Sequence, residues 1–268
     1  MRLSDGQLRR YDQEGFLAID RLIDDDTVAE LREAYGDVLN RRVEAPADQM
    51  LGGRIRVITW PAAAHPAFGD NPALAVLREL ADQVLGEASP TFDMLIYKPS
   101  GDPEITPWHQ DMAYSTQPFA PGGADIPSWT IRFWVALDHV DEENGCMHFL
   151  PGYHREPLRE HHVIAGDPGD ASRLLELVDP DGQVDLERAV TVPLPAGGAT
   201  MHSYGTPHFA GPNRSADRPR RAYIVNFANP NRPPILGSPQ EMTPTTPPPG
   251  LPSDRTAQGA RATRVAST

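Results

Sequence analysis

The chain contains a single cysteine, a single lysine and no run of eighteen apolar residues. The lone Cys146 excludes an intramolecular disulfide, so we expect a small buried apolar role for it. Without a long apolar run the sequence predicts no transmembrane helix, and the first residues lack the apolar stretch of a signal peptide. We therefore expect a soluble, cytoplasmic protein.

Positive charge is also scarce, because 24 lysine and arginine residues face 37 aspartate and glutamate residues, for a formal net charge of −13. Nucleic acids and anionic membranes require a basic footprint on their partner. The composition therefore excludes both as electrostatic partners and favours a small-molecule substrate. The oligomeric state is not indicated by the sequence.

Helical signals dominate the first third of the chain. Residues 4–14 form a polar helix candidate, and the apolar residues 15–19 that follow are typical of an early strand. Apolar residues at helical spacing then predict a helix to residue 39 that is capped within residues 24–27. A third helix is expected over residues 72–85, with Asn71 as its cap and Gly86 just past its end. These helices have one apolar face each and are expected to pack on a larger core.

From about residue 90 the apolar period changes to two, which is typical of strands. The predicted strands are residues 92–97, 130–140, 147–150, 190–194, 199–204 and 221–228. Many short strands behind a helical third indicate a mainly β fold with packing helices, whose core is a double-stranded β-helix, the cupin-like jelly roll. We expect one domain over residues 1–228 and a Pro-rich, disordered tail over 229–268. Residues 117–128 and 155–185 are expected to be irregular loops that act as lids or specificity elements.

Two histidines and one carboxylate are the ligand set that holds non-haem Fe(II) on one face. His109 and Asp111 offer an imidazole and the carboxylate, and on an extended strand both side chains would share one face. The third ligand is His208 or His202, since both have an arginine twelve residues later. We favour His208, because its arginine, Arg220, leads into a strand, and a strand aims a guanidinium better than a loop does.

Other acidic histidine pairs compete with this one, because about one His-x-Asp triplet is expected by chance in such a chain. His139 and Asp141 have the same spacing but open an acidic turn, which favours a solvated strand end. His154 with Glu156 follows a Pro-Gly turn, which favours a surface position. For Lys98 a charge at a strand end is the simplest interpretation.

Several short motifs occur in a characteristic order along the chain. They are Lys98-Pro99, Trp108-His109-Gln110-Asp111, Trp134-Val135-Ala136-Leu137, Asn144-Gly145-Cys146, Leu150-Pro151-Gly152-Tyr153-His154 and His208 followed by Asn213. With these motifs the chain resembles the phytanoyl-CoA dioxygenase (PhyH-like) family of Fe(II)/2-oxoglutarate-dependent oxygenases over about residues 5–228. The ordered succession is far more specific than any one motif.

The resemblance implies three iron ligands and four residues around the co-substrate 2-oxoglutarate. The implied ligands are His109, Asp111 and His208, and the implied pocket residues are Arg220, Met94, Trp134 and Arg56. Arg220 is the implied partner of the distal carboxylate, a role that suits the two parallel donors of a guanidinium. Family members often carry a small or hydroxyl residue where Ala210 stands, so we expect Arg220 to share this carboxylate with another group.

The implied activity is O2-dependent oxidation of a C–H bond in a small, largely apolar molecule, coupled to decarboxylation of 2-oxoglutarate to succinate. Hydroxylation is the default outcome, and cyclisation, desaturation or epimerisation depend on how the substrate is placed. A tailoring step in secondary-metabolite or antibiotic biosynthesis fits such chemistry. Two alternatives stay open: an iron dioxygenase that needs no 2-oxoglutarate, and a non-catalytic jelly-roll binding module.

Overall fold

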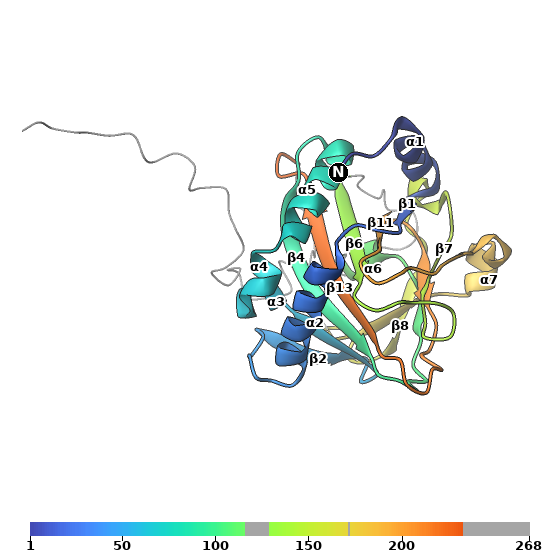
Figure 1. Ribbon diagram of the computed structural model, residues 1–268. Helices are drawn as coiled ribbons and strands as arrows, with labels where there is room; N and C mark the ends of the chain where they lie inside the picture. Colours follow the sequence, from blue (N-terminus) through green and yellow to red (C-terminus); the bar gives the residue numbers. More distant parts are fainter. Residues whose placement is uncertain (116–128, 171, 233–268) are drawn as a thin grey trace, which may run out of the picture.

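Two antiparallel β-sheets form the centre of the computed structural model, which describes residues 1–115, 129–170 and 172–232 (Figure 1). The larger sheet has the order β1 (Phe16–Ile19), β11 (Ala199–Ser203), β6 (Thr130–Ala136), β13 (Arg220–Ala228), β4 (Ser89–Lys98), β3 (Ile55–Thr59) and β2 (Ala47–Leu51). The smaller sheet has the order β10 (Val190–Val192), β7 (Met147–Phe149), β12 (His208–Ala210) and β5 (Thr106–His109). A separate hairpin pairs β8 (His161–Ala165) with β9 (Leu174–Leu177).

Three long helices form where local signals place them: α1 (Asp5–Glu14), α2 (Asp25–Leu39) and α5 (Pro72–Leu85). Ser4 makes a capping box with Gln7 at the start of α1, which satisfies two otherwise free backbone donors. The side chain of Asn71 caps α5, and Gly86 ends it in a positive-φ conformation, as predicted. The short helical turns are α3 (Pro61–Ala64), α4 (Pro66–Gly69), α6 (Asp111–Ser115), α7 (Pro180–Gln183), η1 (Tyr153–Arg155) and η2 (Leu186–Arg188).

Two apolar layers hold the fold together. In the outer layer, α2 and α5 lie along the outer face of the larger sheet (Figure 1), where Leu31 and Leu77 pack near Phe133 and Val225. The inner layer fills the space between the two sheets and contains Trp134, Phe149 and Ile224. This layered arrangement confirms the predicted jelly roll with helices packed outside it.

The structure differs from the expected element pattern in three respects. Residues 155–185, predicted to be an irregular loop, contain the β8–β9 hairpin and the helical turn α7. The first third supplies β2 and β3 to the larger sheet, which were not predicted, whereas β1 forms at the strand expected over residues 15–19. Strand β6 ends at Ala136 rather than at residue 140, and Val140 makes only an isolated bridge to Leu194. The expected loop 117–128 and most of the expected tail lie outside the described residues.

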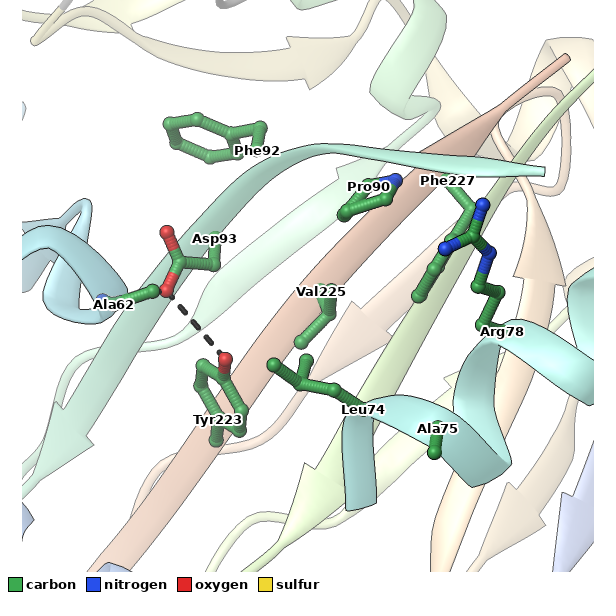
Figure 2. Close-up of a pocket in the computed structure, with 10 residues that line it drawn as sticks. All are labelled: Ala62, Leu74, Ala75, Arg78, Pro90, Phe92, Asp93, Tyr223, Val225 and Phe227. Atoms are coloured by element: carbon green, nitrogen blue, oxygen red, sulfur yellow. Dashed lines mark hydrogen bonds between the residues drawn. The ribbon is translucent and has the colours of Figure 1, made fainter. Parts of the chain in front are cut away.

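A small cavity of about 200 Å³ lies between α5 and the outer face of the larger sheet (Figure 2). Its walls are mostly apolar, with Leu74 on the helix side and Val225 and Phe227 on the sheet side. Asp93 reaches this region from the outer face of β4, and its carboxylate accepts a hydrogen bond from the Ala62 amide at 2.9 Å. In the described part of the chain, no helix combines the length and apolar character that crossing a membrane requires.

Candidate metal centre

His109, Asp111 and His208 form a buried cluster on the smaller sheet. His109 ends β5 and His208 begins β12, and the two residues are direct partners in the register of these neighbouring strands. One ligand atom from each of the three side chains lies within 4.8 Å of the others. Oδ1 of Asp111 lies 3.6 Å from Nε2 of His109 and 3.7 Å from Nε2 of His208. The three side chains therefore converge on one point with two nitrogen donors and one oxygen donor.

Asp111 reaches this point from a helix, which corrects the expectation that it shares an extended strand with His109. The strand ends at His109, and Asp111 is the first residue of α6. The turn between them is held by Gln110, whose side chain donates to the carbonyl of Gly205 at 2.7 Å and accepts from the amide of Arg159 at 2.9 Å. The bend at Gln110, rather than strand alternation, brings the carboxylate beside the imidazole.

The hydrogen bonds of the two imidazoles fit a metal-binding role. Nδ1 of His109 lies 2.7 Å from the carbonyl oxygen of Pro107, and Nδ1 of His208 lies 2.9 Å from that of Thr206. A carbonyl only accepts, so each Nδ1 carries a proton, and in the neutral form of each ring Nε2 keeps its lone pair. Both lone pairs therefore belong to the atoms nearest Asp111. This donor set, two neutral imidazoles and one carboxylate, fits Fe(II).

Asp111 is held ionised by its surroundings. Burial by itself raises the pKa of this carboxyl, but the nearby Arg132 and the surrounding imidazoles outweigh burial and hold the pKa well below its usual value. Nη1 of Arg132 donates to Oδ1 at 2.5 Å. Oδ2 lies 3.5 Å from Nε2 of His202, and neither of these two atoms has a hydrogen-bond partner among the described residues. His202 is thus a neighbour of the cluster that lies beside Oδ2 of Asp111, with its ring centre 4.9 Å from that of His208.

Arg132 is the residue of this cluster that sequence reasoning missed. It lies on β6 of the larger sheet, directly opposite His202 on β11 and Asn226 on β13. Its sequence signal is an arginine within the strongly apolar strand Thr130–Ala136, where a charge is costly to bury unless it is paired. Such a charge indicates a partner across the fold, but the sequence does not identify Asp111 as that partner.

Two of the residues implied for the 2-oxoglutarate pocket lie side by side in the inner layer. Trp134 on β6 and Met94 on β4 are both opposite Ile224 on the central strand β13, so the three residues form one row across the sheet. All three belong to the inner apolar layer. The guanidinium carbon of Arg220, at the start of β13, lies 5.5 Å from the centre of the Trp134 ring. The sheet register therefore brings Met94, Trp134 and Arg220 to the same interior.

Arg220 has the features of an anion-binding group. Its side chain is 1 % exposed, and burial lowers its pKa to about 10. Nη1 donates to the carbonyl of Gly145 at 2.7 Å, while Nε is buried without a hydrogen-bond partner among the described residues. A buried guanidinium with a free donor fits a carboxylate ligand such as the distal group of 2-oxoglutarate.

Arg56 is not brought to this interior. It alternates on β3 with Ile55 and Val57, which belong to the inner layer, so its own side chain lies on the other face. There it pairs with Asp48 at 2.9 Å and donates to the carbonyl of Leu39. The structure therefore places Arg56 in an ion pair beside α2.

Lys98 is the last residue of β4, as expected for a charge at a strand end, and its side chain is fully buried. Nζ donates to the carbonyl of Glu104 at 2.7 Å and to that of Gly211 at 2.6 Å. Burial, followed by the charge of Arg220, lowers the pKa of Lys98 to about 6. Lys98 and Arg220 are also direct partners in the β4–β13 register, so two basic side chains meet at this end of the interior.

The competing histidine pairs lie elsewhere, as expected. The side chain of His139 is 63 % exposed, and its partner Asp141 is paired with Arg218 at the surface. Nε2 of His154 lies 3.1 Å from the carbonyl oxygen of Asp12, near α1. Cys146 is buried, in agreement with its expected apolar role.

The fold and the cluster together define a class: double-sheet jelly-roll proteins with a buried His-Asp-His group. The family model of phytanoyl-CoA dioxygenase (PhyH) matches residues 11–222. The chain therefore belongs to the PhyH family, which confirms the resemblance carried by its motifs.

Curated relatives agree with this assignment. Peroxisomal phytanoyl-CoA dioxygenase of Rattus norvegicus is 30% identical over 179 residues, which cover 59% of this chain and 50% of that protein. A probable alpha-ketoglutarate-dependent hypophosphite dioxygenase of Stutzerimonas stutzeri is 31% identical over 139 residues, covering 52% of this chain and 44% of that protein. The matched region spans about half the length of these relatives.

Solved structures confirm the fold over nearly the whole of the described chain. EvdO2 from Micromonospora carbonacea var. aurantiaca, in complex with 2-oxoglutarate, is 30% identical with a TM-score of 0.69, and the match covers 88% of this chain and 98% of EvdO2. SnoK, a non-heme alpha ketoglutarate dependent carbocyclase from nogalamycin biosynthesis, is 22% identical with a TM-score of 0.64, covering 94% of each chain. The likeness to SnoK shows the shared fold.

Proposed function

We propose that the protein is an Fe(II)- and 2-oxoglutarate-dependent oxygenase. The observation that carries this proposal is the convergence of His109, Asp111 and His208 on one point, with Arg220 buried in the same interior. The three cluster residues would hold Fe(II), and Arg220 would bind the distal carboxylate of 2-oxoglutarate beside Trp134. When bound, the iron supplies the oxidation of 2-oxoglutarate and substrate by O2. EvdO2, which is similar over most of its length, was crystallised with 2-oxoglutarate, and this supports the same co-substrate here.

We further propose that the substrate is a small, largely apolar molecule, modified in a tailoring step of secondary metabolism. The first turns after the carboxylate ligand supply Met112 and Tyr114, which pack with Tyr204 and Leu175 in one buried cluster. An aromatic and apolar cluster next to the proposed carboxylate ligand suits an apolar ligand body. A net charge of −13 argues against a CoA ester, whose phosphates need clustered basic residues.

The reaction that such a site performs includes oxidation of a substrate C–H bond, by hydroxylation, cyclisation, desaturation or epimerisation. SnoK and the epimerase SnoN share the fold and are named for two of these outcomes in their own pathway. Which outcome this chain produces depends on the position of the substrate radical relative to its neighbours. We propose hydroxylation as the default, because it needs no second reactive group on the substrate.

Uncoupled turnover tests the cofactor assignment without a known substrate. The purified protein is loaded anaerobically with Fe(II), mixed with 2-oxoglutarate and exposed to O2, and succinate is measured. We expect succinate from the wild type and at least a hundredfold less from His109→Ala. A matched control is His139→Ala, which alters the exposed histidine of the same His-x-Asp spacing and should leave succinate formation unchanged.

A metal titration with Mn(II) completes this test, because it reports binding independently of turnover. We expect one bound metal per chain in the wild type and in His139→Ala, and none in His109→Ala. A wild-type protein that binds neither metal nor 2-oxoglutarate would refute the proposed function and favour a non-catalytic binding module. Full succinate formation by Arg220→Ala would instead favour an oxygenase that does not rely on this arginine for its co-substrate.

A further inference from the structure

Arg132 contacts the proposed carboxylate ligand at the oxygen that faces the metal position. Nη1 of Arg132 lies 2.5 Å from Oδ1 of Asp111. The same Oδ1 is the oxygen nearest Nε2 of both His109 and His208. A metal bound by the three side chains would therefore share this oxygen with a guanidinium.

The guanidinium of Arg132 is held in place by contacts with neighbouring residues. Its Nε donates to Oδ1 of Asn226 at 3.0 Å, and its guanidinium carbon lies 5.2 Å from the centre of the Tyr204 ring. Asn226 is the direct partner of Arg132 in the β13–β6 register. The side chain of Arg132 is 12 % exposed, so solvent screens its charge only weakly.

The charge of Arg132 changes the net charge of the protein groups around the metal position. With both imidazoles neutral, His109, Asp111 and His208 supply one negative charge to a bound ion. Arg132 offsets this charge, so that the protein groups around the ion sum to zero. A fixed positive charge nearby destabilises Fe(III) more than Fe(II), because the repulsion grows with the charge of the ion. Local charge is one of the protein's means of setting an iron potential.

We propose that Arg132 is a positioning residue that holds Oδ1 of Asp111 and biases the bound iron toward the ferrous state. The inference rests on the proposed function, since it presupposes iron at this cluster. It assigns to Arg132 a role in keeping the enzyme in its O2-reactive oxidation state between turnovers. Asn226 supports that role by orienting the guanidinium.

The test is the one-electron Fe(III)/Fe(II) midpoint potential of the iron-loaded protein, measured without 2-oxoglutarate by mediated spectroelectrochemistry. For Arg132→Gln we expect the Fe(III)/Fe(II) equilibrium to move at least tenfold toward Fe(III). For a one-electron couple, this lowers the midpoint potential by about 59 mV. Arg132→Lys retains the positive charge and is expected to stay within threefold of the wild type. The rate of ferrous oxidation in air should rise for the glutamine variant and not for the lysine variant.

The chain offers a matched control in Arg218, which pairs with Asp141 of the exposed His139-x-Asp141 pair. His139, Asp141 and Arg218 repeat the combination of histidine, aspartate and arginine at the surface, away from the metal position. Arg218→Gln removes the arginine of this surface group and should leave the potential unchanged. A second route adds charge without removing Arg132. Asn226→Asp places a carboxylate beside its Nε and is expected to shift the equilibrium toward Fe(III) as Arg132→Gln does.

Two outcomes would overturn the inference. One is an unchanged potential in Arg132→Gln and Asn226→Asp, each with one iron bound. The other is an equal shift in the lysine and glutamine variants, because the shape of the side chain and not its charge would then matter. If Arg132→Gln does not fold, the inference is tested by the other two variants. It then requires a potential near that of the wild type for Arg132→Lys and a shift toward Fe(III) for Asn226→Asp. Failure of the proposed function is distinguishable, since the wild type would then bind no iron at the cluster or would form no succinate from 2-oxoglutarate, whereas the potential is measured on iron-loaded protein without 2-oxoglutarate.

Discussion

Asp93 should make the stability of this protein fall as pH rises from about 4 to about 7. The carboxyl is 1 % exposed, and burial raises its pKa from 3.8 to about 7, only partly offset by the hydrogen bond from the Ala62 amide. One of its oxygens has no hydrogen-bond partner among the described residues, and the hydroxyl of Tyr223 lies 3.5 Å from the other (Figure 2). The folded protein therefore prefers this carboxyl protonated.

The sign follows from proton linkage. Between the two pKa values the folded state binds one proton more than the unfolded state, so the free energy of unfolding decreases by about 1.4 kcal/mol per pH unit. Raising the pKa from 3.8 to about 7 corresponds to about 4 kcal/mol, all of it lost above pH 7. Asp93→Asn keeps an acceptor for Ala62 but does not ionise. We expect the asparagine variant to gain about 3 kcal/mol on the wild type between pH 5 and pH 8.

Urea unfolding of both proteins at a series of pH values measures this difference. Asp48→Asn is the control, because a hydrogen bond from Arg56 lowers the pKa of Asp48 and the group is already ionised at pH 5. Its stability relative to the wild type should stay constant from pH 5 to pH 8. Parallel curves for the wild type and Asp93→Asn over this range would refute the reasoning, as would an Asp93 carboxyl pKa near 4 measured by NMR.

Other expectations concern the candidate metal centre, the proposed 2-oxoglutarate contact and two glycines with positive φ. His208→Ala should abolish Mn(II) binding in a calorimetric titration, whereas His202→Ala should weaken it about tenfold to a hundredfold, because His202 lies beside the proposed carboxylate ligand and outside the cluster of three. Arg220→Gln should weaken 2-oxoglutarate binding to the metal-loaded protein by about 2 kcal/mol while Mn(II) affinity stays unchanged, since it removes a charge-assisted hydrogen bond. Gly145→Ala should lower stability in urea by at least about 2 kcal/mol, because φ is 84° and a new Cβ would lie 2.4 Å from a backbone oxygen. Gly101→Ala, at φ 71° with open space around the position, should cost only the backbone strain of about 1 to 2 kcal/mol.

Local signals explain why much of the fold was predictable. The helix Pro72–Leu85 is determined by its Asn71 cap, its apolar stripe and Gly86, all of which act within a few residues. The long strands β4 and β13 carry enough alternating apolar residues to be seen alone. The short strands β5 and β12 hold His109 and His208 of the candidate metal centre but span only four and three residues. Their strand geometry depends on pairing with each other, which no local pattern expresses.

The sequence by itself determined the residue types of the metal centre, because His109, Asp111 and His208 carry the chemistry in their own side chains and ordered motifs. It also determined the family. Only the tertiary structure decided how the charges are arranged around that centre. Arg132, Asn226 and His202 come from three different strands that antiparallel register aligns across the larger sheet. Arg132 and His202 lie beside Asp111, and Asn226 accepts a hydrogen bond from Arg132. Arg56 was placed in the pocket from the sequence, yet the alternation of β3 turns it to the opposite face. Register and alternation are fixed by pairing between distant segments, so the sequence supplies the ligands and the sheet supplies their electrostatic surroundings.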